Sequence, residues 1–201
     1  ASFNGQRIID YGADESWGPK MTGDPYRPYY SWYAGPEFGQ LSPLSPQPDN
    51  VKNFFQTGTT LNNSLAFSGG TENLSYRISY GNINRSLVIE NAKRDQHQIG
   101  LNGVYDINKR LAVNTNMLFT TYGTTGQPAE GYALDGSNVT QNFNQWFQRQ
   151  IDINRLRNYR NKDNSLQSWN IGDPNSTSDP SLYLQPQYWD SPWFIVNENF
   201  T

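Results

Sequence analysis

The chain has 201 residues, no cysteine, and 15 basic against 18 acidic residues, which gives a net charge of −3. The absence of cysteine excludes a disulfide scaffold and thiolate metal sites, and the slight acidic excess argues against nucleic-acid binding. Apolar residues make up only 35% of the chain, which is low for a soluble β-sandwich that must bury two sheets. Aromatic residues make up 14%, too many for a disordered chain, so we expect a folded protein with large wetted surfaces.

No apolar run approaches the roughly 18–20 residues of a transmembrane helix, although a barrel strand needs only about 9–11 residues and leaves a weaker mark. The chain opens at Ala1 with neither a methionine nor a basic leader. That opening is expected of a mature protein or of an internal fragment.

Residues 1–58 are predicted to form a long irregular region with at most one short strand, near residues 6–10. Proline is frequent here, and it removes the backbone donor that a central strand needs. The prolines concerned are Pro19, Pro25, Pro28, Pro36, Pro43, Pro46 and Pro48.

Residues 59–123 are predicted to form four antiparallel strands, either as two hairpins or as one meander. Apolar and polar residues alternate along them, which gives each strand one apolar and one polar face. The clearest alternation comprises Leu74, Tyr76, Ile78 and Tyr80, with Ser75, Arg77 and Ser79 between them. We expect the strands at residues 59–68, 73–81, 94–106 and 110–122.

The connections between these strands alternate in length. Residues 69–72 and 106–109 read as tight turns, whereas residues 82–93 form a longer loop. Tight turns at one end and long loops at the other are typical of outer-membrane barrels. Because four strands facing lipid would leave open edges, we predict an all-β fold class: antiparallel strands of a large transmembrane β-barrel, present as a fragment, with long extracellular loops.

Residues 124–201 are predicted to form a second large extracellular loop region, like residues 1–58. Repeated glycines break regular structure there. A short helix is expected where apolar residues recur at spacings of three and four. These residues are Phe143, Trp146, Phe147, Gln150, Ile151 and Leu156.

Four segments of the chain carry a resemblance to a known family. They are Glu15-Ser16-Trp17-Gly18-Pro19-Lys20-Met21, the hairpin over residues 67–80, the stretch 146–150 with 156–159, and Trp169-Asn170 with residues 188–193. In this order they resemble an internal section of the SusC-like (RagA-like) TonB-dependent transporters of the Bacteroidetes outer membrane. Thr22 departs from the family pattern, which has aspartate before the glycine.

The resemblance implies a protein of the cell outer membrane that contacts membrane lipid and imports glycans or peptides. It implies a SusD-like surface lipoprotein as partner, and TonB as a second partner through regions outside this chain. It implies no cofactor, no metal and no enzymatic activity. Two alternatives stay open: a structural subunit of a larger outer-membrane complex, and a secreted soluble carbohydrate-binding β-domain.

Tyrosines and tryptophans crowd the loops and are the candidate contact residues. They either pack the loops together, which we favour, or contact the lipoprotein or the substrate. The candidates are Trp17, Tyr29, Tyr30, Trp32, Tyr33, Trp169, Trp189 and Trp193. On the strands, the resemblance makes some of Tyr76, Tyr80, Tyr105 and Tyr122 an aromatic girdle at the membrane boundary.

The order and spacing of residues along the chain do not indicate a catalytic site or a metal site. His97 is the single histidine, and Asp95 shares its face, but nothing nearby resembles an activated nucleophile. We expect Asp14 and Glu15 to fix a loop by hydrogen bonds in preference to binding a metal.

Overall fold

The computed structural model describes residues 1–127, 129–132 and 138–199. The chain divides into two compact units. Residues 57–127 form one, which we call the strand unit, and residues 1–56 with 128–201 form the other, which we call the loop unit. The regular structure is mostly antiparallel strand with little helix, and none of the helices among the described residues is long and apolar enough to cross a bilayer.

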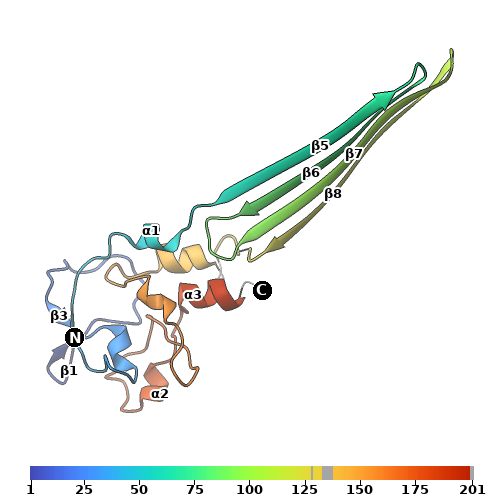
Figure 1. Ribbon diagram of the computed structural model, residues 1–201. Coiled ribbons are helices and arrows are strands. Elements are labelled where there is room, and N and C mark those ends of the chain that lie inside the picture. Colours follow the sequence, from blue (N-terminus) through green and yellow to red (C-terminus); the bar gives the residue numbers. More distant parts are fainter. Residues whose placement is uncertain (128, 133–137, 200–201) are drawn as a thin grey trace. The chain divides into compact units, whose positions relative to one another are not determined.

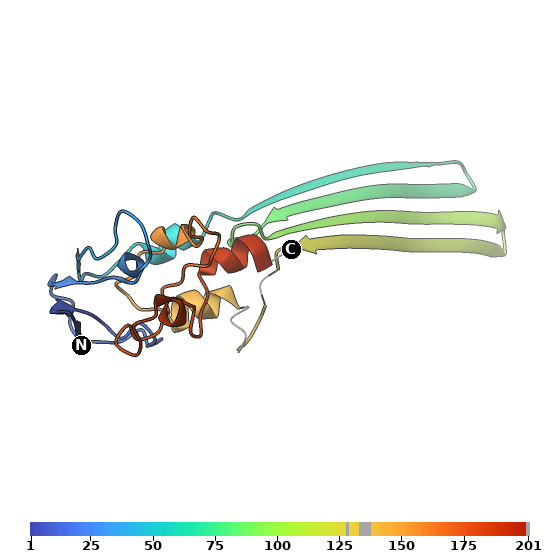
Figure 2. The ribbon, with the colours of Figure 1, turned by 90° about the horizontal axis from the view of Figure 1, so that it is seen from below.

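The strand unit is one four-stranded antiparallel sheet. Its strands are β5 (Thr59–Gly70), β6 (Leu74–Ser86), β7 (Lys93–Asn108) and β8 (Leu111–Thr125). They pair in the order β5-β6-β7-β8, so the chain forms a meander whose strands lie side by side (Figures 1 and 2). The strands are longer than the sequence predicts. The expected loop of residues 82–93 shortens to 87–92 as a result.

The two tight turns have simple physical causes. In the β5–β6 turn, the Thr71 amide donates to the Leu74 carbonyl oxygen over 2.7 Å. A Cβ on Gly70 would lie 2.4 Å from that oxygen, so only glycine allows this approach. In the β7–β8 turn, the Asn108 side-chain oxygen accepts a hydrogen bond from the Arg110 amide over 2.9 Å. A bulge between Asp106 and Asn108 shifts the register there.

The register places most of the large apolar residues of the four strands on one face, which we call the apolar face, whereas Ile83, Val104 and Leu118 lie on the other. Directly paired residues share a face, and two complete rows are Leu65–Tyr80–Ile99–Phe119 and Phe67–Ile78–Leu101–Met117. The opposite face, which we call the polar face, carries mainly serine, asparagine, glutamine, threonine and arginine. The sheet therefore has the alternation that the sequence predicts.

The first half of the loop unit holds short elements. A hairpin pairs β1 (Ser2–Phe3) with β2 (Gln6–Arg7), and Asn4 and Gly5 in its turn take the positive φ angles that such a turn needs. The expected strand near residues 6–10 is thus confined to Gln6–Arg7. The other elements are β3 (Pro25–Tyr26), η1 (Tyr29–Trp32), β4 (Ser42–Pro43) and α1 (Asn50–Phe54).

The second half of the loop unit holds short helical segments. They are η2 (Gln141–Gln145), η3 (Arg155–Arg157), α2 (Pro180–Tyr183), α3 (Pro192–Phe194) and η4 (Ile195–Asn199). Of these, α3 and η4 follow each other directly. The helix expected over residues 143–156 is therefore wrong beyond Gln145. Side chains compete with helical hydrogen bonds there: Asp152 accepts from the Asn154 amide over 2.9 Å, and Gln148 binds backbone carbonyls elsewhere.

Aromatic rings form the core of the loop unit. The ring of Phe143 stacks on that of Phe54 with centroids 4.4 Å apart, and Phe147 meets Trp169 edge-on at 5.4 Å. The largest fully buried side chains include Trp169, Trp193, Tyr11, Phe143 and Phe147. Segments that are distant in sequence thus bury their aromatic residues against one another.

Candidate functional site

The apolar face of the strand unit is exposed, which is unusual for so large an apolar surface. Phe67 is 64% exposed, Phe119 63% and Met117 61%. From the Leu65 row to the row of Leu74 and Tyr105, the band spans three two-residue steps, or about 20 Å. Because barrel strands tilt by about 35–45°, this length along the strands corresponds to a height of about 15 Å, against about 25 Å for the whole lipid-facing band of a membrane barrel.

Polar residues border this band toward the 87–92 loop. The Tyr80 hydroxyl lies 2.8 Å from Nδ1 of His97, and Asn84 donates to the Asp95 carboxylate over 2.7 Å. His97 and Asp95 are therefore both engaged by strand neighbours. No group of three or more metal-ligating side chains occurs within the part of the chain that the structure describes.

The tyrosines of the strands fall on different faces. Tyr76, Tyr80 and Tyr105 lie on the apolar face, at or near the two borders of the band. Tyr122 pairs with Gln96 on the polar face, where its ring lies 4.8 Å from the Arg94 guanidinium. Tyr122 thus does not belong with the possible girdle residues.

The aromatic candidates of the loop unit are mostly buried. Trp17 is 93% exposed and Tyr30 is partly exposed, whereas the others lie in the interior. The buried ones are Tyr29, Trp32, Tyr33, Trp169, Trp189 and Trp193. As the loop unit stands, a ligand or partner reaches Trp17 and the edge of Tyr30, and the other rings hold the loops together.

Hydrogen bonds donated by two of these tryptophans show how they join the loops. The indole of Trp193 donates to the Ile153 carbonyl oxygen over 2.6 Å. The indole of Trp189 donates to the Asp14 carboxylate over 3.1 Å. Asp14 therefore fixes a loop, as the sequence suggested.

Segments that carry the family resemblance converge in the loop unit. The Ser16 hydroxyl donates to the carbonyl oxygens of Gln145 over 3.0 Å and Phe147 over 3.3 Å. The ring of Trp146 stacks on that of Trp189 at 6.4 Å. Segments near residues 16, 146 and 189 are thus one packed arrangement, although they are far apart in sequence.

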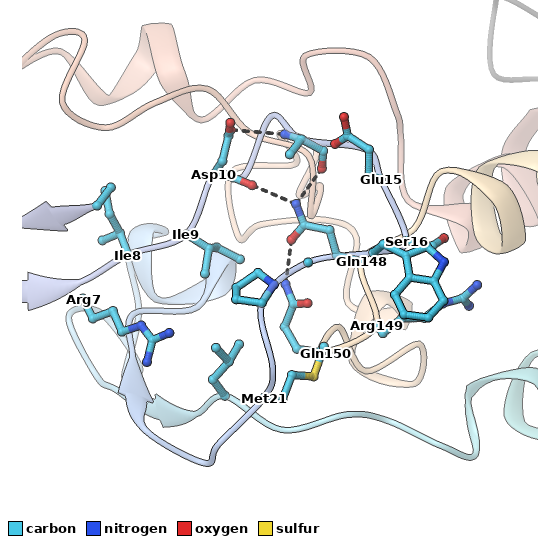
Figure 3. A pocket seen from close by; sticks show the side chains of 16 residues that line it. Arg7, Ile8, Ile9, Asp10, Glu15, Ser16, Met21, Gln148, Arg149 and Gln150 are labelled. Carbon is cyan, nitrogen blue, oxygen red and sulfur yellow. Dashed lines mark hydrogen bonds between the residues drawn. The ribbon is translucent and has the colours of Figure 1, made fainter.

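A pocket of about 320 Å³ lies beside the Glu15–Met21 segment (Figure 3). Its apolar lining includes Ile8, Ile9, Pro19, Met21 and Leu44, and its charged lining includes Arg7, Asp10, Glu15 and Arg149. Trp17 also lines it and is exposed to solvent. An apolar hollow with an exposed tryptophan and several polar groups is a candidate small-ligand site.

Gln148 organises the wall of this pocket. Its Nε2 donates to the carbonyl oxygens of Asp10 over 2.8 Å and Ala13 over 2.5 Å (Figure 3). Its Oε1 accepts a hydrogen bond from Nε2 of Gln150 over 2.6 Å. The Gln148 side chain therefore ties the segment of residues 148–150 to the segment of residues 10–13, which gives the pocket a preformed wall.

Burial governs the electrostatics of the loop core. It raises the pKa of the Tyr11 hydroxyl to about 12, and it raises the pKa values of Tyr26, Tyr29 and Tyr33 as well. Removing water disfavours the phenolate form. These tyrosines stay neutral at physiological pH and act as packing groups.

Two buried polar residues with large roles escaped the sequence reasoning. Asn170 is fully buried and accepts hydrogen bonds from the amides of Tyr188, over 2.8 Å, and Trp189, over 3.2 Å. Arg27 is buried with its guanidinium 3.5 Å from the centre of the Trp32 ring. Asn170 lies within one of the segments that carry the resemblance, which was the available signal, whereas nothing around Arg27 in the sequence marked it.

Comparison with protein-family models finds no match, and comparison with curated protein sequences finds none either.

Proposed function

We propose that this chain is a wall section, with outer loops, of a SusC-like outer-membrane importer of glycans or peptides that works with a SusD-like lipoprotein. The observation that carries the proposal is the exposed apolar band on one face of the sheet, opposite a polar face. In a membrane barrel the apolar face contacts lipid and the polar face lines the interior.

Two further features support this assignment. The strands have 12 to 16 residues, enough to cross a bilayer at a tilt. The open edges of β5 and β8 require further strands, because unpaired backbone groups are costly in hydrocarbon. The remaining wall therefore comes from polypeptide outside this chain.

Spin labelling tests the membrane placement. This chain contains no cysteine, so in a full-length protein freed of any cysteines elsewhere, single cysteines can be placed at Phe67 and Met117 on the apolar face and at Asn102 and Thr120 on the polar face. The full-length protein is labelled with a nitroxide and reconstituted in lipid. Labels on the apolar face should collide mainly with dissolved oxygen, and those on the polar face with a water-soluble nickel chelate.

Labels on the apolar face that are shielded from both reagents would show a buried core and overturn the proposal. That result, with purification free of detergent, favours the soluble carbohydrate-binding domain. Import itself is tested by uptake of labelled oligosaccharides and peptides in a deletion strain, with and without the proton-motive force. Correct membrane placement without energy-dependent uptake favours the structural subunit.

A further inference from the structure

Two arginines lie directly opposite each other on the polar face. Arg85 of β6 pairs with Arg94 of β7 in the sheet register. Side chains so paired have Cβ atoms about 4.5–5.5 Å apart, and like charges at that distance destabilise a sheet. The pair therefore requires either a counter-charge or a function that justifies the repulsion.

The polar face of the four strands provides no counter-charge close to the pair. Among the described residues, neither Arg85 nor Arg94 belongs to an ion pair. On the four strands, Asp106 is the sole acidic residue of the polar face, and it lies at the opposite end of β7. The buried Nε of Arg94 has no hydrogen-bond partner in the part of the chain that the structure describes.

The geometry presents the two guanidiniums to an incoming anion. The Arg94 guanidinium lies 4.8 Å from the centre of the Tyr122 ring, which orients it. Arg85 is exposed, and the pair lies one residue from the loop end of both strands. Planar guanidinium groups donate paired N–H bonds to carboxylates, and such charge-assisted bonds are the strong ones.

We propose that Arg85 and Arg94 form a binding site for a carboxylate group of the cargo, and that the cargo is therefore an acidic glycan or peptide. This inference rests on the proposed function, in which the polar face lines the barrel interior. The exposure of Arg85 at the loop end suits a transient ligand that arrives from that end. An acidic side chain from elsewhere in the same protein is the competing occupant.

Calorimetric titration of the full-length protein in detergent at low salt tests the proposal. The acidic probes are tri-glutamate and tri-galacturonate, and their neutral counterparts are tri-glutamine and the methyl ester of tri-galacturonate. At least one acidic probe should bind about tenfold or more tightly than its counterpart, as expected for one charge-assisted interaction. Added salt should reduce this preference.

Matched variants locate the site. The double variant Arg85→Gln with Arg94→Gln should lose the preference for the acidic probe. The double variant Arg85→Lys with Arg94→Lys keeps the charge but not the planar fork, and it should retain only part of the preference for the acidic probe. Arg77→Gln removes an arginine from the same face that pairs with Asn102, and it should leave the preference intact.

Equal binding of acidic and neutral probes to the unaltered protein overturns the proposal. If the double glutamine variant then also melts at a lower temperature, the counter-charge is an acidic side chain of the same protein. Spin labels separate this failure from that of the proposed function. If they place the polar face in water and no acidic preference appears, only the carboxylate site is lost.

Discussion

The buried amide of Asn170 donates a hydrogen bond to the carbonyl oxygen of Tyr11 over 3.1 Å, joining residues 159 positions apart. The same amide group donates to the Gly12 carbonyl oxygen over 3.2 Å, while its oxygen accepts from two amides of the 188–189 segment. One side chain thus satisfies four backbone groups of two loops. Buried backbone groups without such partners would be costly, so this contact substitutes for secondary structure.

Replacing Asn170 with alanine should open both loops. Each buried group left unpaired costs about 1–3 kcal/mol, so the amides of Tyr188 and Trp189 should exchange with solvent at least about tenfold faster. Hydrogen-exchange mass spectrometry of the full-length protein measures this change. Asn175→Ala, at an exposed asparagine, is the control, and equal protection in the two variants would contradict the prediction.

Replacing Arg27 with lysine should destabilise the surrounding loop, although the positive charge is kept. Its guanidinium lies against Trp32 and donates to the Ser31 carbonyl oxygen over 3.0 Å. A desolvated cation–π contact contributes about 2 kcal/mol, and lysine has neither the planar surface nor the fixed fork. Arg27→Lys should therefore reduce exchange protection in residues 26–34.

The matched control for Arg27 is Arg7→Lys. Arg7 forms an exposed ion pair with Asp24 at 3.0 Å, and such pairs contribute about 0–1 kcal/mol. Its replacement should leave the protection of residues 26–34 unchanged. Unchanged protection in Arg27→Lys would show that the positive charge, and not the stacked guanidinium, stabilises this region.

The loop unit should lose stability in alkaline solution. Burial raises the pKa of Tyr11 from about 10 to about 12. Between these values the unfolded chain releases a proton that the folded chain retains, so the free energy of unfolding falls as pH rises. Two pKa units correspond to about 2.7 kcal/mol at most. The contribution of Tyr11 to the free energy of unfolding is fully present below a pH of about 10 and is lost as the pH rises through about 12.

Absorbance at 295 nm follows tyrosinate formation in this titration. Tyrosinate should appear in two phases, first from exposed tyrosines and then together with the loss of exchange protection around Tyr11. Tyr11→Phe removes one of the titrating groups and should make the alkaline loss less steep. A single phase centred near the ordinary tyrosine pKa would argue against buried, neutral tyrosines.

A lysine in the apolar band should impair membrane assembly. Met117 lies on the apolar face in the row of Phe67, Ile78 and Leu101, and a lysine near the bilayer midplane costs about 2–4 kcal/mol on the lipid face of a barrel. Met117→Lys should lower the fraction of full-length protein that migrates as a folded, heat-modifiable band. Thr120→Lys on the polar face of the same strand should assemble normally. Equal yields would argue against lipid contact.

The sequence by itself determined the four strands, their alternating faces and the two tight turns. Those features depend on period-two patterns and on local chemistry such as the carbonyl contact at Gly70, so neighbouring residues specify them. Strand lengths were less certain, because polar residues near Ser86 and Lys93 continue the pairing without an apolar signal.

Only the tertiary structure decided which loop aromatics are buried, where the helix near Phe143 ends, and that Asn170 and Arg27 hold the loops. The loop residues have no regular period, and their partners lie more than a hundred positions away in several cases. Long-range packing chooses among many possible contacts of this kind. The pairing of Arg85 with Arg94 likewise appeared only once the strand register was known.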